Sequence, residues 1–168
     1  MQFMEAVMSQ NVPAVGFIGK AARLGEQISL VCLFVIVGLV FGQLVLRNLF
    51  SVTYASVDEL ARLAHIYLVY LLVPLAFIEG LHVNIDLVTN YAPVKLKFLL
   101  DIFVTLMMGA FALIFLISDY QFMVRSGNVP TPAMQMPNYL FFSGAYLGMA
   151  LLLLAACQRL IFQLRHRP

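Results

Sequence analysis

Four long apolar stretches, each bounded by charged residues, set the pattern of this chain. They lie between Glu26 and Arg47, Arg62 and Glu79, Asp101 and Asp119, and Arg125 and Arg159, and none contains an Asp, Glu, Lys or Arg. An apolar helix needs about 20 residues at 1.5 Å each to cross roughly 30 Å of hydrocarbon. The pattern therefore predicts four transmembrane helices.

We expect these helices at residues 27–47, 57–79, 94–119 and 137–164, in a single membrane domain that covers 1–168. The third helix continues past Asp119, which makes it longer than one bilayer thickness. Residues 1–26 place apolar and charged side chains at helical spacing. This is typical of an interfacial amphipathic helix, and a disordered cytoplasmic tail is the alternative. The expected fold class is an all-α integral membrane protein.

Composition narrows the class of protein further. Of the 168 residues, 62% are hydrophobic and only 11% are charged, whereas an ordinary soluble domain has roughly 25% charged residues. This excludes a soluble globule and leaves no hydrophobic surface for a second domain. The net charge of +2 comes from basic residues at helix ends, where membrane proteins place them. We therefore expect membrane lipids, and no nucleic acid, among the partners.

Lysine and arginine are distributed unequally between the two sides of the membrane. One side holds only Arg47, Arg62 and Arg125. The other holds Lys20, Arg23, Lys95, Lys97, Arg159, Arg165 and Arg167. Because basic residues accumulate on the cytoplasmic side, we predict that both termini are cytoplasmic.

The second predicted helix has a clear start signal. Ser56 and Glu59 stand in the S-x-x-E arrangement of a capping box, in which each side chain satisfies a free backbone N–H of the first turn. Asp58 precedes Arg62 by four residues, the favourable order for an ion pair. In the third helix, Asp101 follows Lys97 by one turn, and we expect this pair to interact as well. A direct contact of Asp101 with a partner protein is the alternative.

The chain is predicted not to be an enzyme, with no catalytic, cofactor or metal site. A charged group inside a bilayer costs at least about 2.5 to 3.5 kcal/mol, so a solute pathway usually carries several of them, and the predicted helices carry very few. His65 and His82 lie roughly 25 Å apart along a helix and cannot form one bis-histidine haem site. We expect His65 to form a hydrogen bond with a neighbouring helix near the outer face.

Small residues favour association instead of catalysis. Gly38 and Gly42 in the first helix, and Gly144 and Gly148 in the fourth, each lie one turn apart, which lets a neighbouring helix approach closely. That neighbour belongs either to this chain or to a partner. Two further small residues, Cys32 and Cys157, lie in the same two helices near the same membrane face. Free thiols are the expectation for them, and a disulfide is the alternative.

Three motifs carry a resemblance to a known family. They are Leu46-Arg47-Asn48-Leu49-Phe50, then Asp58-Glu59-Leu60-Ala61-Arg62, then Gly80-Leu81-His82-Val83-Asn84-Ile85-Asp86-Leu87. With the four helices, they make residues 27–162 resemble the small membrane subunit, or Q subunit, of tripartite ATP-independent periplasmic (TRAP) transporters. The chain departs from the family pattern at Ser56, where an aromatic residue is common, and at Glu79, near a position that is often basic.

The resemblance implies an accessory subunit in the bacterial inner membrane. In this family a large permease subunit carries the solute and the coupling sodium ions, and a periplasmic solute-binding protein delivers the solute. The small subunit pairs with the large one, supports its scaffold and helps to form the outer docking surface for sodium-coupled uptake of an organic anion. Two alternatives are the membrane anchor of a redox enzyme complex and a stand-alone four-helix exporter.

The resemblance also suggests roles for the matched residues. Arg47, Asp58, Glu59 and Arg62 would order the outer ends of the first two helices, with local capping and ion pairing as the simpler explanation. His82 and Asp86 would either position the segment after the second helix or contact the large subunit.

Overall fold

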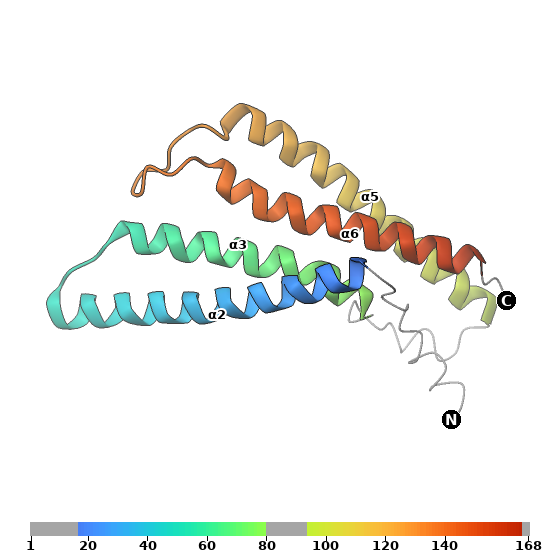
Figure 1. Ribbon diagram of the computed structural model, residues 1–168, viewed down its shortest axis with the longest axis horizontal. Helices are drawn as coiled ribbons and strands as arrows, with labels where there is room; N and C mark the ends of the chain where they lie inside the picture. Colours follow the sequence, from blue (N-terminus) through green and yellow to red (C-terminus); the bar gives the residue numbers. More distant parts are fainter. Residues whose placement is uncertain (1–16, 80–93, 166–168) are drawn as a thin grey trace, which may run out of the picture.

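A computed structural model describes residues 17–79 and 94–165 of the chain. Four helices account for nearly all of them: α2 (Phe17–Phe50), α3 (Ala55–Ile78), α5 (Val94–Ser126) and α6 (Tyr139–Arg165). Each is long and apolar enough to cross a membrane, which confirms the all-α, four-span fold class (Figure 1). Residues 1–16, in the expected interfacial segment, lie outside the described part.

The first helix differs most from its expected bounds. α2 begins at Phe17, ten residues before the predicted start, and continues without a break to Phe50. This stretch contains no proline, and its early charged residues, Lys20 and Arg23, lie on an exposed side of the helix. The segment 17–26 is thus the first part of the same helix. At 1.5 Å per residue, α2 is about 51 Å long, so it must tilt in a bilayer or extend beyond it.

α2 ends in an αL motif. Ser51 has a φ of 54°, in the left-handed region that a helix-ending residue commonly adopts. Its N–H donates to the carbonyl of Arg47 at 3.1 Å, and the N–H of Val52 donates to the carbonyl of Leu46 at 3.5 Å. The chain then reverses direction over three residues and enters α3.

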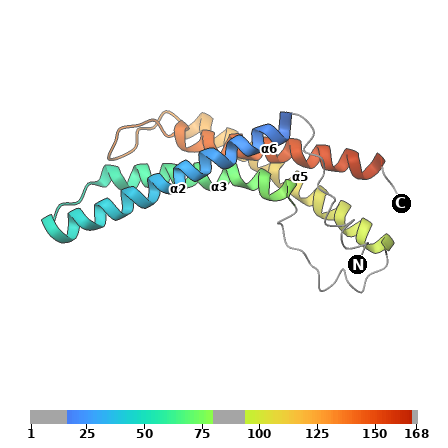
Figure 2. The same ribbon diagram turned by 60° about the horizontal axis from the view of Figure 1, so that its bottom comes forward.

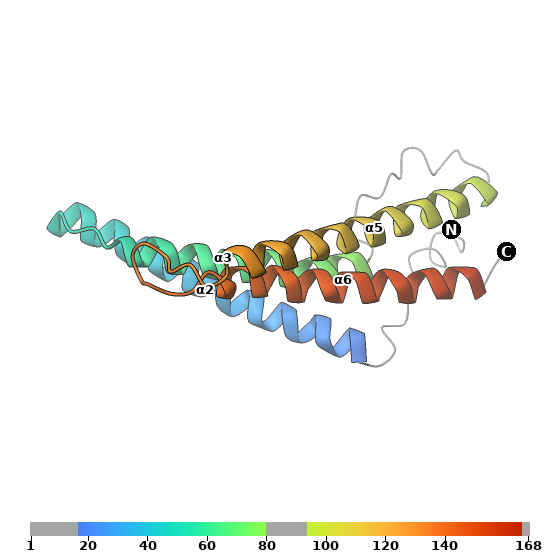
Figure 3. The same cartoon turned by 90° about the horizontal axis from the view of Figure 1, so that it is seen from above.

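The four helices lie side by side in the order α2, α3, α6, α5. α3 contacts both α2 and α6, α5 contacts α6, and α2 has a smaller contact with α6. Figure 1 shows the two antiparallel hairpins, α2–α3 and α5–α6, joined through the central pair α3 and α6, and Figure 3 shows them from above. The arrangement is therefore an open layer, and α2 and α5 form its edges.

The layer has two distinct ends. We call the end with the turns 51–54 and 127–138 the loop end, and the opposite end, where α2 begins and α6 stops, the terminal end. At the loop end the α2–α3 hairpin projects well beyond the α5–α6 hairpin in every view (Figures 1 and 2). The two hairpins are thus staggered along their length.

Small residues allow α2 to lie close to α3. Ala22 and Ser29 are almost fully buried. A Cβ atom on Gly25 would lie 3.0 Å from the backbone oxygen of Leu71, closer than most Cβ contacts in proteins. The Ser29 hydroxyl is 2.8 Å from the carbonyl of Gly25 and 3.2 Å from that of Leu68. Close backbone approach and a satisfied hydroxyl therefore replace large apolar side chains here.

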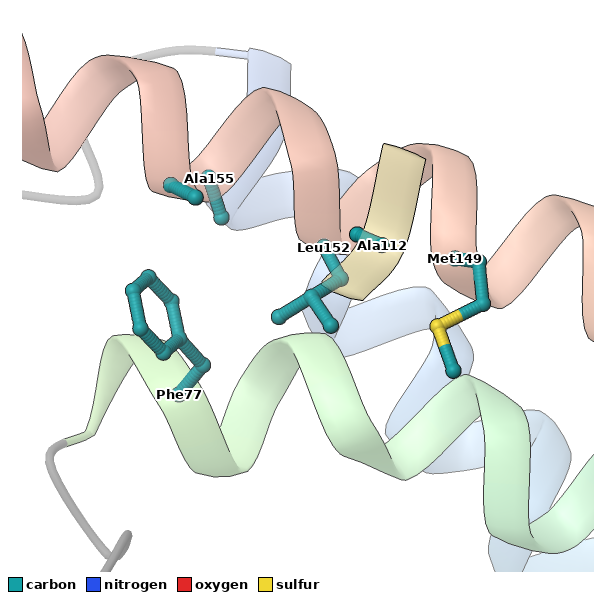
Figure 4. Packing of buried hydrophobic residues seen from close by; sticks show 6 residues of the cluster. Phe77, Ala112, Met149, Leu152 and Ala155 are labelled. Carbon is teal, nitrogen blue, oxygen red and sulfur yellow. The ribbon is translucent and has the colours of Figure 1, made fainter. Parts of the chain in front are cut away.

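The apolar core lies between α3, α5 and α6, toward the terminal end. Figure 4 shows the Phe77 ring of α3 directed toward Ala155 of α6, with Leu152 and Met149 of α6 also reaching toward α3. Ala112 of α5, fully buried, completes this cluster. Outside this core, large apolar side chains point away from the chain, and Phe34 of α2 is 75% exposed. Such surfaces require lipid or a protein partner to cover them.

Candidate functional site

The loop end is where the resemblance placed most of its functional residues, and Glu59 has the most definite role there. One Glu59 carboxylate oxygen accepts a hydrogen bond from the N–H of Ala133 and the other from the N–H of Met134, both at 2.9 Å. These partners are more than 70 residues away in sequence. The carboxylate therefore ties the α5–α6 loop to the first turns of α3.

The α5–α6 loop is itself tightly hydrogen-bonded. The Thr131 N–H donates to the Met136 carbonyl at 2.8 Å, and the Thr131 hydroxyl accepts from the Met136 N–H at 3.1 Å. An isolated bridge joins Pro130 to Pro137. Gln135, with a φ of 56°, turns the chain between them. A loop held in this way presents one defined surface instead of many conformations.

The predicted capping box does not form. Tyr54 is the N-cap of α3 and makes no side-chain capping hydrogen bond, and Ser56 lies inside the helix. Glu59 cannot serve the N-terminus of α3 because both its oxygens bind the distant loop. The motif was the correct signal for a helix start near Ser56, but its acidic residue has a tertiary partner.

Asp58, Arg62 and His65 occupy an exposed side of α3. The expected Asp58–Arg62 ion pair is absent: among the described residues, the one salt bridge lies elsewhere. The His65 side chain is exposed and makes no hydrogen bond with another helix in the described part of this chain.

Arg47 lies in the last turn of α2, with an exposed side chain. It belongs to the same end of the molecule as Asp58 and Glu59, but only its backbone carbonyl takes part in an observed contact, the one that ends α2. His82 and Asp86, the two remaining residues of the family motifs, lie outside the described residues.

The two glycine pairs have different surroundings. A Cβ atom on Gly144 would lie 2.9 Å from ring atoms of Tyr67, and one on Gly148 would overlap the backbone of Tyr70. This pair therefore allows α6 to lie against α3 within the chain. For Gly38 and Gly42 of α2, no described atom would come within 4 Å of an added Cβ.

A second polar cluster lies at the terminal end. Asp101 forms a salt bridge with Arg159 at 2.8 Å and accepts a hydrogen bond from the Gln163 amide at 2.5 Å. The Arg159 guanidinium also lies over the Phe77 ring, 5.3 Å from its centre, and donates to the Phe77 carbonyl at 3.4 Å. Asp101 thus pairs across to α6, and the side chain of Lys97, its expected partner, lies outside the described part.

Two functional contacts were missed in the sequence. Gly25 and Ser29 lie one turn apart, which is the same small-residue spacing as in the other glycine pairs. They were missed because they lie on either side of the boundary expected between the tail 1–26 and the first helix. The Thr131 to Met134 turn was treated only as a loop. Its two adjacent free N–H groups could not be assigned to Glu59 without the fold.

Several of the polar side chains described above make contacts between helices. Within residues 17–79 and 94–165, no group of three or more His, Cys, Asp or Glu side chains could hold a metal ion. Cys32 and Cys157 are both free. The buried polar side chains Ser29, Thr105 and Gln163 bind other helices or their own backbone. These features define a helical membrane component built for helix contacts.

Comparison with known families agrees with this class. Residues 36–166 match the DctQ component of the tripartite ATP-independent periplasmic transporters. The chain therefore belongs to this family, as the resemblance predicted, and is the small permease component of a TRAP transporter. It is a multi-pass protein of the bacterial inner membrane, from a family of transporter components and not of enzymes. No curated protein matches the chain.

Proposed function

We propose that this chain is the accessory subunit that pairs with the large TRAP permease subunit, supports its scaffold and helps to dock the periplasmic solute-binding protein. The open layer of helices is the observation that carries this proposal. Helices α2 and α5 lie at its edges, and the apolar face of α2 is exposed over most of its length. A single layer of four helices is suited to covering another membrane protein.

The large subunit is then the carrier of the solute. The described helices of this chain use their buried hydroxyl and amide groups for mutual contacts, whereas a pathway for an organic anion would need such groups turned toward the solute. We expect the coupling sodium ions to bind in the large subunit and no cofactor to bind here. The transport cycle is sodium-coupled uptake of an organic anion.

In this proposal both termini lie in the cytoplasm and the loop end lies in the periplasm. Support comes from Lys20, Arg23 and Arg159 at the terminal end, since basic residues accumulate on the cytoplasmic side. The α5–α6 loop, held by Glu59, then faces the compartment of the soluble binding protein. A preorganised loop loses little conformational entropy when a partner docks on it.

The test has two stages. The tagged chain is extracted from its native membrane in mild detergent, and proteins that co-purify at near-equal stoichiometry are identified by mass spectrometry. A large TRAP permease subunit is the expected result. The purified pair and the chain alone are then reconstituted into liposomes with a sodium gradient and the binding protein. Uptake by the pair only supports the proposal, whereas co-purified haem proteins or uptake by the chain alone contradicts it.

A further inference from the structure

A polar stripe on the exposed side of α3 makes no hydrogen bond or ion pair within the described residues. Asp58, Arg62 and His65 are spaced at i, i+4 and i+7, so they lie on one side of the helix. Val69, 40% exposed, continues the same side toward the terminal end. We call these four residues the α3 stripe.

The other two sides of α3 are occupied. Leu68 and Leu71 lie against α2 near Ser29 and Gly25. Tyr67 and Tyr70 lie against α6, and the Tyr67 hydroxyl is 2.8 Å from that of Ser143. The stripe therefore lies on the remaining side, which neither neighbouring helix covers.

The depth of the stripe in the membrane follows from the length of α3. The helix ends at Ile78, next to the exposed Glu79 and level with Arg159, which marks the polar boundary at the terminal end. Counting back from Ile78 at 1.5 Å per residue, His65 lies about 20 Å and Arg62 about 24 Å along the helix, both less than the roughly 30 Å of hydrocarbon. Any tilt of α3 moves them deeper.

Lipid tails are an unsuitable environment for such a surface. A guanidinium and an imidazole inside the hydrocarbon need hydrogen-bond acceptors, which lipid tails do not provide. Within the described chain, Arg62 makes no ion pair and His65 makes no hydrogen bond.

We propose that the α3 stripe is the surface on which a transmembrane helix of the large permease subunit docks. That helix presents a carboxylate or another acceptor to Arg62 and His65 and a donor to Asp58. This inference rests on the proposed pairing and adds to it the face of the small subunit that makes the contact.

Two other occupants fit the stripe less well. A soluble binding protein stays outside the hydrocarbon and cannot reach Arg62 or His65. A second copy of this chain, related by an axis along the membrane normal, places identical residues at the same depth. Arg62 would then face Arg62, and like charges at short range repel.

The first experiment measures co-purification of the large subunit with the tagged full-length chain in its native membrane. The variants Arg62→Leu and His65→Leu remove the polar groups but suit a lipid-facing position, so they should insert and fold. Each is expected to lower the recovered large subunit at least about tenfold, since the group that pairs with Arg62 or His65 in the partner helix is left buried without its partner. Arg62→Lys, which keeps the charge, should recover part of that loss.

Arg125→Leu is the matched control because Arg125 is also an exposed arginine near the loop end, but on the edge helix α5. It should leave recovery unchanged. The inference is overturned if Arg62→Leu and His65→Leu both recover the large subunit as well as the wild-type chain does. If even the wild-type chain recovers no large subunit, the proposed function itself has failed.

A photo-crosslinking amino acid at Val69 gives an independent readout that does not change the charges. Crosslinks from position 69 to the large subunit are expected, and the same probe at Ile114, 65% exposed on the edge helix α5, is the control. Crosslinks from position 69 to lipid alone, or to a second copy of the chain, would overturn the inference.

Discussion

Gly148 offers the sharpest test of the way α6 lies against α3. In Gly148→Ala, the new Cβ would lie 2.9 Å from the Tyr70 Cβ and closer still to the Tyr70 carbonyl, whereas two carbon atoms need about 3.5 Å. The backbone of a helix cannot yield as a flexible side chain can. The two helices must therefore separate by an amount on the order of 1 Å near this position, which loses dispersion contacts on either side.

Overpacking of this kind costs about 1–3 kcal/mol. We expect the upper part of that range because the buried residues Met149 and Leu152 follow Gly148 in the same interface. The assay is reversible unfolding of the purified full-length chain in mixed detergent micelles, followed by circular dichroism. Gly38→Ala is the control, since no described atom lies within 4 Å of the new Cβ and alanine is the better helix former. Equal stability of Gly148→Ala and the wild-type chain would refute this account of the interface.

The remaining predictions concern the two polar clusters. Glu59→Ala should speed amide hydrogen exchange in the loop 131–136, because two N–H groups of the loop lose their acceptor. Asp58→Ala, which removes an exposed neighbour of Glu59, should leave the exchange unchanged. Equal exchange in both variants would contradict the role of Glu59 in holding the loop. Asp101→Leu should destabilise the chain by about 1–3 kcal/mol by leaving Arg159 unpaired. The double variant with Arg159→Leu should be less destabilised than the sum of the single variants, as measured by the same unfolding assay. Additive losses would show that the pair is uncoupled.

The clusters hold the layer together at both ends. Glu59 joins α3 to the α5–α6 loop at the loop end, and Arg159 joins α6 to Asp101 of α5 and to Phe77 of α3 at the terminal end. Between them, α3 and α6 approach closely along Gly144 and Gly148. α3, α5 and α6 thus form a fixed body, while most of the surface of α2 is left for lipid or a partner.

The sequence by itself determined the class of protein and the number of spans. A run of about 20 uncharged apolar residues has the length of a transmembrane helix. The helix satisfies every backbone N–H and C=O group by hydrogen bonds within the same segment, which the bilayer interior requires. The motifs around Arg47 and Asp58 pointed to the correct family. Helix ends were predicted to within three residues except where α2 extends back to Phe17 and where α5 continues to Ser126, seven residues beyond the expected end.

Tertiary structure alone decided the partners of the polar residues. Glu59 fits the local capping rule at Ser56 and Glu59, but its carboxylate binds N–H groups more than 70 residues away. Likewise, the two glycine pairs have the same spacing in the sequence. They differ only in the structure, where Gly148 lies against α3 and Gly38 has no neighbour within 4 Å of an added Cβ. Local spacing shows which groups share a side of a helix. Whether that side meets another helix depends on contacts between residues far apart in the chain, and neighbouring sequence does not encode them.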